Sequence, residues 1–106
     1  MAPAGDRSIK YDPDTDEIGR LAKGDPVAAR KLVARYSDRL MAVAWRMTGA
    51  RDAAEDIVQE AFIRMIRQAP DWEPGRARFS TWLHRVTVNL CYDRLRKAST
   101  RNEWAA

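Results

Sequence analysis

Apolar side chains recur at three- and four-residue intervals along most of this chain, which is the spacing of amphipathic α-helices. No segment shows the alternation of apolar and polar residues that marks a β-strand. We expect a short first helix that begins with Pro13 in its first position and ends near Lys23, because Gly24 follows. Gly49 is expected to stop the second helix in the same way.

Two longer helices come next, each with an apolar stripe. Asp25 and Pro26 form the start signal of the second helix, which runs to about Thr48. Its apolar positions are Leu32, Tyr36, Leu40, Val43, Ala44 and Met47. The third helix starts at Asp52 and is ended by Pro70. Its apolar stripe consists of Ala54, Ile57, Val58, Ala61, Phe62, Met65 and Ile66.

A loop and a final helix complete the predicted fold. Residues 68–78 contain two prolines and a glycine, which indicate a loop. Ser80 or Thr81 can cap a last helix that runs from about Thr81 to Lys97, and residues 98–106, which lack periodicity, are expected to fray. We therefore predict an all-α fold: a compact bundle of three main helices plus a short N-terminal helix, with a long ordered loop before the last helix.

The composition fits one small domain. The chain has 106 residues, of which 45% are hydrophobic and 32% are charged, as in globular proteins. No apolar run approaches the roughly 20 residues of a membrane span, so no membrane insertion is expected, and the N-terminus does not resemble a secretory signal. Cys91 is the only cysteine, and one cysteine with one histidine does not make a zinc site. These features favour the reducing cytoplasm and predict neither a metal nor a cofactor.

Charge is unevenly distributed between the two parts of the chain. Residues 1–63 carry ten basic and eleven acidic side chains, a net charge of −1. Residues 64–106 carry nine basic and four acidic side chains, a net charge of +5. A basic C-terminal part indicates a polyanionic partner, such as nucleic acid or an acidic protein, and the alternative is an ordinary solvated surface.

An acidic and amide patch lies on the third predicted helix. Glu55, Asp56, Gln59 and Glu60 share the face opposite the apolar stripe. We interpret this patch as a docking surface for a basic or amide-rich partner helix, with a solvated helix face as the alternative. Catalysis is not indicated, because di-iron bundles need Glu-x-x-His pairs and His84, the only histidine, does not follow a glutamate at that spacing.

The loop and the last helix carry candidate nucleic-acid contacts. Trp72 lies in a Pro/Gly-rich loop with Arg76 and Arg78, which would suit an unstacked base beside its phosphates. The equally weighted alternative is that Trp72 closes the end of the bundle. On the last helix a sector of roughly 60° contains Arg85, Asn89, Tyr92 and Arg96. Asparagine can read a base edge, arginine can bind phosphate or guanine, and tyrosine can stack.

The neighbouring face of the last helix is apolar. The residues expected in the core there are Leu83, Val86 and Leu90. Trp82 lies between the two faces and is interpreted mainly as a core anchor. Cys91 is expected to be a buried, unreactive thiol.

Five motifs, in this order and spacing, resemble bacterial sigma factors of the extracytoplasmic-function group. The motifs are Leu21–Ala28, Thr48–Gly49, Ala53–Arg64, Phe79–Leu90 and Asp93–Arg96. The third is similar to the signature helix of that group, and the last two are similar to its promoter-reading helix. The resemblance covers roughly residues 17–98.

This resemblance implies a non-catalytic domain that binds core RNA polymerase and promoter DNA. By position, Asp56, Gln59 and Glu60 match the residues that dock on the clamp coiled coil of the largest polymerase subunit. The loop and last helix would recognise and melt the minus-ten element on the non-template strand. The residues that match its base-binding site are Ser80, Arg85, Val86 and Asn89, and residues 72–78 match the loop that captures a flipped base.

Family members carry a second helical domain that reads the minus-thirty-five element, and this chain ends before one. We therefore expect a truncated chain or an isolated module. It would comprise a flexible leader (residues 1–12), a sigma region 2 domain (13–98) and the start of an interdomain linker (99–106). The resemblance also implies an anti-sigma factor as a partner. The alternative hypothesis is a helical adaptor that binds an acidic protein through its basic face.

Overall fold

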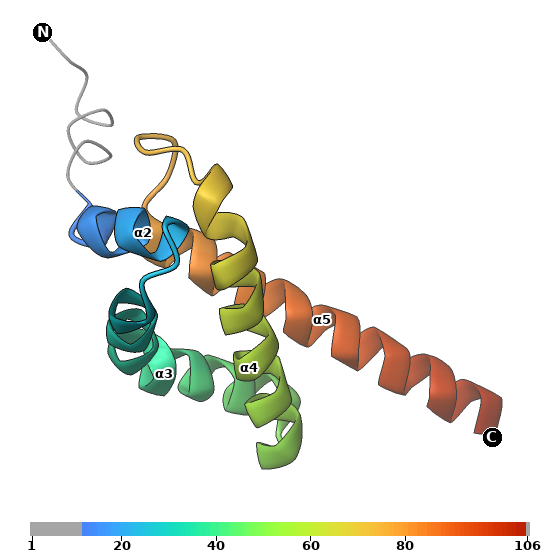
Figure 1. Cartoon of the computed structure of the whole chain (residues 1–106). Coiled ribbons are helices and arrows are strands. Elements are labelled where there is room, and N and C mark those ends of the chain that lie inside the picture. Colours follow the sequence, from blue (N-terminus) through green and yellow to red (C-terminus); the bar gives the residue numbers. More distant parts are fainter. Residues whose placement is uncertain (1–11, 106) are drawn as a thin grey trace, which may run out of the picture.

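The computed structural model describes the backbone of residues 12–105 and the side chains of residues 12–100. Within this range the α-helices are α2 (Thr15–Ala22), α3 (Pro26–Thr48), α4 (Arg51–Gln68) and α5 (Phe79–Ala105), with the short 3₁₀ helix η1 (Ala69–Asp71) after α4 (Figure 1). No described residue lies in a β-strand, so the predicted all-α bundle is confirmed. None of the described helices is long and apolar enough to cross a membrane.

The ends of α3 follow directly from local sequence. The Asp25 carboxylate accepts a hydrogen bond from the backbone N–H of Val27 at 2.9 Å, and Pro26 occupies the first helical position. Gly49 adopts a φ of 67° and its N–H donates to the carbonyl of Trp45 at 2.8 Å. Both boundary signals predicted for this helix are therefore confirmed.

The first helix starts later than predicted because a turn precedes it. The Asp12 carboxylate accepts the N–H of Asp14 at 3.0 Å, and the Asp12 carbonyl accepts the N–H of Thr15 at 3.1 Å. Pro13 consequently lies in this turn and not in the first position of α2. Asp12, which the sequence placed in the flexible leader, is held by these bonds. The rest of the predicted leader, residues 1–11, lies outside the described residues.

The last helix is longer than predicted at both ends. It starts at Phe79, whose N–H donates to the Asp12 carboxylate at 2.7 Å, so neither Ser80 nor Thr81 is its cap. It also continues through residues 98–105, for which the sequence predicts fraying; Ala98, Arg101 and Glu103 are the strong helix formers in this stretch. Figure 1 shows that the C-terminal part of α5 projects beyond the other helices.

The core has two parts. The larger part joins all the helices, and its members include Ile18, Leu32, Tyr36, Phe62, Met65, Phe79 and Leu83. The smaller part consists of Ala44, Ala54, Ile57 and Cys91. Its alanines let α3, α4 and α5 approach closely. The predicted apolar stripes face these cores with two exceptions: Val43 is partly buried but belongs to neither core, and Ile66 is 50% exposed on the outer side of α4.

Candidate functional site

A hollow of about 420 Å³ opens between the end of α4, the following loop and the start of α5. Three of the predicted DNA-binding residues, Trp72, Arg76 and Arg85, line it together. Gln68 and Trp82, which the sequence did not assign to a binding site, also line it. The lining therefore combines indole rings, an amide and two guanidinium groups, which can bind an unstacked base and its phosphates, with the carboxylates of Asp71 and Glu73.

The wall of the hollow is aromatic and continuous with the core. The Trp72 ring meets the rings of Phe79 and Trp82 edge-on, with centroids 5.7 and 5.8 Å apart. Phe79 in turn lies 5.8 Å from the ring of Tyr36 on α3. Trp72 is partly buried against the larger core, so it closes the end of the bundle and also lines the hollow. Trp82 packs on the same core, as predicted.

The cations near the hollow differ in their partners. Arg76 forms an ion pair of 3.1 Å with Glu73, and both side chains are mostly exposed. Such pairs contribute at most about 1 kcal/mol, so a phosphate can replace Glu73. Arg85 is exposed and forms no ion pair with any residue whose side chain the structure describes. Arg78 is exposed at the end of the loop, and its carbonyl accepts the N–H of Trp82 at 3.1 Å.

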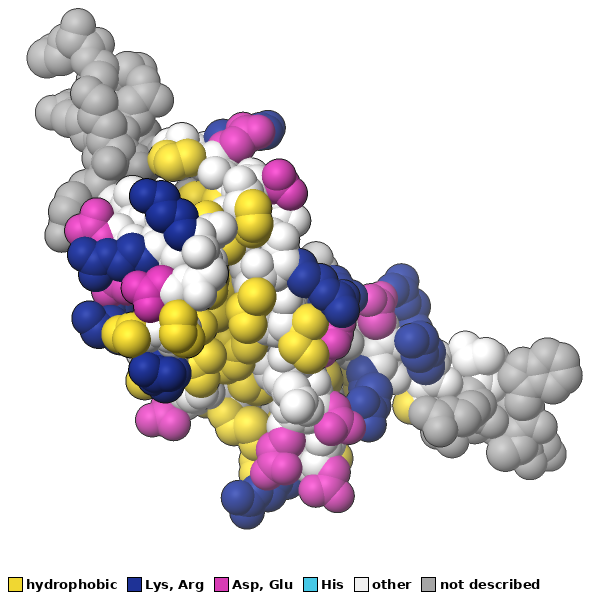
Figure 2. All heavy atoms as spheres, in the orientation of Figure 1, with side chains coloured by type: hydrophobic (Ala, Val, Ile, Leu, Met, Phe, Trp, Pro, Cys, Tyr) yellow, Lys and Arg dark blue, Asp and Glu magenta, His cyan; other side chains and the backbone are white. Residues whose placement is uncertain are grey.

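The polar face of α5 continues from the hollow toward the C-terminus. Asn89, Tyr92 and Arg96 are exposed along it, with Tyr92 56% exposed. The Asn89 amide makes no hydrogen bond to another described residue. Arg96 is paired with Asp93, three residues earlier. Figure 2 shows Lys and Arg side chains gathered over the projecting part of α5.

Two residues predicted for DNA binding are not on this face. Val86 is partly buried and packs against the larger core. Ser80 is partly buried in the first turn, and helical geometry places it roughly 140° around α5 from Arg85. Neither residue lines the hollow. Of the other predicted residues, three line the hollow (Trp72, Arg76 and Arg85) and three continue along the same face of α5 (Asn89, Tyr92 and Arg96). Arg78 lies in the loop and is not part of the hollow's lining.

The outer face of α4 carries both polar and apolar groups. Asp56 and Gln59 are exposed and Glu60 is partly exposed. Ile63 and Ile66, which lie four and seven residues after Gln59, are 36% and 50% exposed. These isoleucines therefore adjoin the acidic patch. The sequence analysis did not predict that this pair is exposed, because it assigned Ile66 to the edge of the buried stripe.

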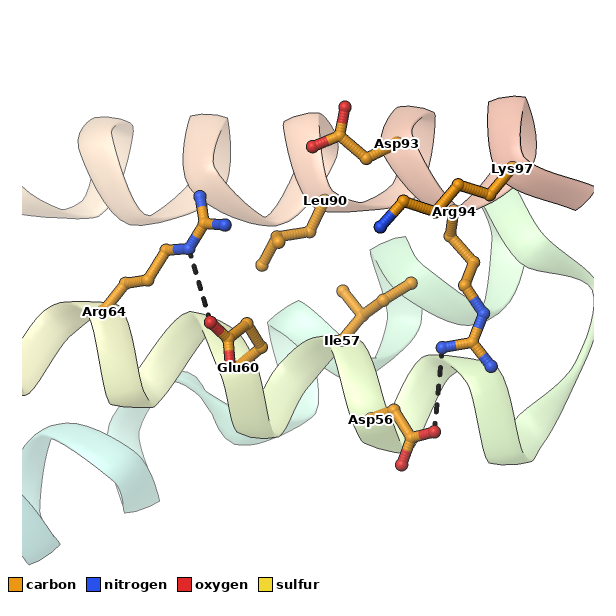
Figure 3. Close-up of a pocket in the computed structure, with 8 residues that line it drawn as sticks. All are labelled: Asp56, Ile57, Glu60, Arg64, Leu90, Asp93, Arg94 and Lys97. Carbon is orange, nitrogen blue, oxygen red and sulfur yellow. Dashed lines mark ion pairs between the residues drawn. The ribbon is translucent and has the colours of Figure 1, made fainter.

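A groove of about 280 Å³ separates this patch from α5. Figure 3 shows Arg94 extending from α5 to the carboxylate of Asp56, at 3.7 Å, and Arg64 reaching Glu60, at 3.6 Å. Two of the three predicted polymerase-docking residues therefore have intrachain cation partners. These side chains are 42–65% exposed, so a partner protein can replace the cations at small cost. Within the described part of the chain, no group of acidic, histidine or cysteine side chains is arranged to hold a metal.

Comparison with known proteins gives one consistent result. Residues 32–101 match the family described as Sigma-70 region 2. SigW of Bacillus subtilis, an ECF RNA polymerase sigma factor, is 42% identical over 80 residues, which are 76% of this chain and 42% of SigW. The ECF RNA polymerase sigma factor SigE of Mycolicibacterium smegmatis is 40% identical over 79 residues, which are 72% of this chain and 30% of SigE. The chain thus spans less than half the length of these relatives.

A solved structure shows the same likeness in three dimensions. An engineered region 2 of sigmaE, determined by NMR in complex with GTAAAA, matches with a TM-score of 0.73 at 35% identity. The match covers 83% of this chain and 90% of that chain. The sequence comparisons and the structural comparison therefore indicate the same family and the same all-α fold.

Proposed function

Because the chain belongs to the Sigma-70 region 2 family, with relatives of the extracytoplasmic-function group, we propose that it is the promoter-reading domain of an alternative sigma factor. It recognises and melts the minus-ten element and binds its non-template strand. The observation that carries this proposal is the hollow in which Trp72, Arg76 and Arg85 meet at the start of α5. The complex of a relative with GTAAAA supports that hexamer as the first probe.

The described groups can supply the free energy that melting requires. Flipping a base out of a duplex costs a few kcal/mol. Stacking on an aromatic ring returns about 1–3 kcal/mol per base, and Trp72 and Trp82 offer rings at the hollow. Arg85 binds a phosphate or a base edge at the same place, and the exposed amide of Asn89 reads a neighbouring base. A flipped base therefore enters the hollow while the strand follows α5.

The binding of labelled GTAAAA, followed by fluorescence anisotropy, tests this proposal. Wild-type protein should bind GTAAAA more tightly than a scrambled hexamer of the same composition. Arg85→Ala should weaken binding at least about five-fold, because a contact to phosphate or guanine is lost. Arg30→Ala, which removes the same charge from an exposed position on α3, is the control and should stay within about two-fold. Equal losses in the two variants would contradict the assigned site.

The outer face of α4 supports a second part of the proposal. Asp56, Gln59 and Glu60 bind the clamp coiled coil of the largest RNA polymerase subunit. The exposed Ile63 and Ile66 add the apolar area that a helix-docking surface needs. The intrachain partners of the two carboxylates are exchanged for cations of the coiled coil when the complex forms.

Two glutamines of α4 make a matched test of docking. Gln59 lies on the outer face, whereas Gln68 lines the hollow at the end of the same helix. In a titration with a peptide of the clamp coiled coil, Gln59→Ala should weaken binding by about 1–2 kcal/mol. Gln68→Ala should bind the peptide like wild type. Unchanged affinity in Gln59→Ala, or an equal loss in both variants, would refute the docking face.

This role locates the protein in the cytoplasm, where transcription takes place, and it requires no catalytic chemistry from the domain. We also propose an anti-sigma factor as a regulatory partner that covers the docking face of α4. Such a partner would compete with the coiled-coil peptide in the same titration. Binding of any polyanion with equal affinity would instead favour a helical adaptor with a basic face.

A further inference from the structure

We propose that Asp12 is a positioning residue for promoter recognition: its carboxylate fixes the start of α5 and, with it, the aromatic wall of the hollow. This inference rests on the proposed function. Asp12 lies well before residue 32, where the match to Sigma-70 region 2 begins. The promoter-reading unit would therefore include the N-terminal turn as well as the family segment.

Asp12 uses both carboxylate oxygens. One accepts the N–H of Asp14 at 3.0 Å within the turn, and the other accepts the N–H of Phe79 at 2.7 Å, 67 residues along the chain. The first N–H groups of a helix have no partner within the helix, so they need an acceptor from outside. A carboxylate at this end also interacts favourably with the helix dipole. Asp12 thus performs, from a distant position, the role that a capping residue of α5 would perform locally.

The turn that carries Asp12 is itself anchored. Asp14 is fully buried, and its carboxylate accepts hydrogen bonds from the Arg35 guanidinium and the Tyr36 hydroxyl of α3. Arg35 also pairs with Glu17 of α2 at 2.7 Å. A buried carboxylate persists only when it is paired and hydrogen-bonded, so these contacts hold the turn in one position. Burial and the adjacent Asp14 raise the pKa of Tyr36, which keeps its hydroxyl protonated as a donor.

The same residues lead directly to the hollow. The Tyr36 ring contacts Phe79, and the Phe79 ring contacts both Trp72 and Trp82, at centroid distances of 5.7 to 5.9 Å. Phe79 is therefore held through its backbone by Asp12 and through its ring by this cluster. Loss of the Asp12 bond would free the first turn of α5, and the rings that line the hollow would no longer be fixed relative to Arg85.

The test compares Asp12→Ala with a matched control. Asp16→Ala removes the same charge from an exposed position on α2 and should behave like wild type. Amide hydrogen exchange of Phe79 reports its bond to Asp12 without DNA, and it should accelerate about five-fold in Asp12→Ala, which is the stability of a typical capping bond, about 1 kcal/mol, expressed as a ratio. The second readout is the affinity ratio between GTAAAA and its single-base variants. That ratio should fall in Asp12→Ala, whereas a purely stabilising residue would lower only the melting temperature.

Asp12→Asn keeps one accepting oxygen but cannot serve both N–H groups, so its exchange rate and affinity ratio should be intermediate. If circular dichroism shows that Asp12→Ala does not fold, Asp12→Asn is used for the test instead. If wild-type protein discriminates among the hexamers and the folded Asp12 variants discriminate equally well, the inference is refuted. If wild-type protein shows no discrimination, the proposed function is refuted instead, and the exchange data still decide whether Asp12 holds α5.

Discussion

At the scale of single residues, Asn89 and Arg96 share one face of α5 but differ in their surroundings. The Asn89 amide is exposed and has no hydrogen-bond partner among the described residues, whereas Arg96 is paired with Asp93. An amide both donates and accepts hydrogen bonds, which lets it distinguish base edges. A guanidinium that exchanges a carboxylate for a phosphate distinguishes only charge. The two residues should therefore contribute differently to DNA binding.

Replacing each by alanine separates these contributions. Asn89→Ala should lose about 1–3 kcal/mol of discrimination between the preferred hexamer and its point variants. Arg96→Ala should lower affinity for all sequences alike and reduce the dependence on salt. The measurement is a titration of single-base-substituted oligonucleotides against both variants. If Asn89→Ala preserves the wild-type ranking of sequences, Asn89 does not read a base.

Cys91 offers a simple check on the smaller core. The thiol is buried, as predicted, and burial raises its pKa above the ordinary value of 9.0. Because the thiolate is the reactive form, native protein should react very slowly with a thiol reagent at neutral pH, and urea-unfolded protein should react rapidly. Rapid labelling of the native protein would show that α3, α4 and α5 do not enclose this residue.

Glu17 should make stability depend on pH in the acidic range. Its hydrogen bond to Arg35 lowers the pKa of the carboxyl below 4.5 in the folded protein. Because the folded pKa is lowered, ionised Glu17 contributes its full stabilisation at pH values above its unfolded pKa. This stabilisation is lost as the pH falls through the folded pKa. Glu17→Gln should therefore lose less stability than wild type on acidification, as measured by urea unfolding. Asp16→Asn, an exposed control on the same helix, should retain the wild-type pH profile.

At the scale of elements, both boundaries of α3 were predicted correctly because they depend on neighbouring residues. The Asp25 carboxylate caps the start of α3 by accepting the N–H of Val27, two residues later. Gly49 ends the helix by donating its N–H to the carbonyl of Trp45, four residues earlier.

The predicted start of α2 was wrong although the Asp12 turn that precedes it is local, with bonds to Asp14 and Thr15. The predicted start of α5 was wrong because it depends on the bond between Asp12 and Phe79, which spans 67 residues. No local pattern contains that information.

The candidate site shows the same division between features that follow from local sequence and features that depend on packing between elements. Helical periodicity alone placed Arg85, Asn89 and Arg96 on one exposed face of α5. The hollow could not be predicted, because its shape depends on how Trp72 packs against rings from another element. The pairing of Asp56 with Arg94 likewise depends on how α4 and α5 cross.

The N-cap of α3 gives an element-scale test. Asp25→Ala should lower the free energy of unfolding by about 1 kcal/mol, because the N–H of Val27 loses its acceptor. Asp38→Ala, at an exposed position in the middle of the same helix, should change it by less than about 0.5 kcal/mol. Urea unfolding followed by circular dichroism measures both. Equal effects would show that the charge of Asp25, and not its cap, is what matters.

At the scale of the whole molecule, the acidic face of α4 borders a groove whose α5 side is lined by Asp93, Arg94 and Lys97. Arg94 and Lys97 lie well around the helix from the face that carries Arg85 and Asn89. Asp56 and Arg94 pair across this groove, and Figure 2 shows basic side chains over the projecting part of α5. The proposed polymerase surface on α4 and the proposed DNA surface on α5 therefore lie on adjacent helices. This arrangement also accounts for the charge imbalance between residues 1–63 and 64–106, because α5 belongs to the second part.

The most direct test of promoter-strand reading is the affinity of wild-type protein for GTAAAA and for its scrambled hexamer over a range of salt concentrations. Phosphate contacts weaken with salt, with a slope of about −0.7 per neutralised phosphate on single strands, whereas base contacts depend little on salt. Both affinities should therefore fall steeply as salt rises, while GTAAAA stays preferred throughout. Equal affinity for the two hexamers at every salt concentration would contradict sequence reading and identify the basic face as a general polyanion-binding surface.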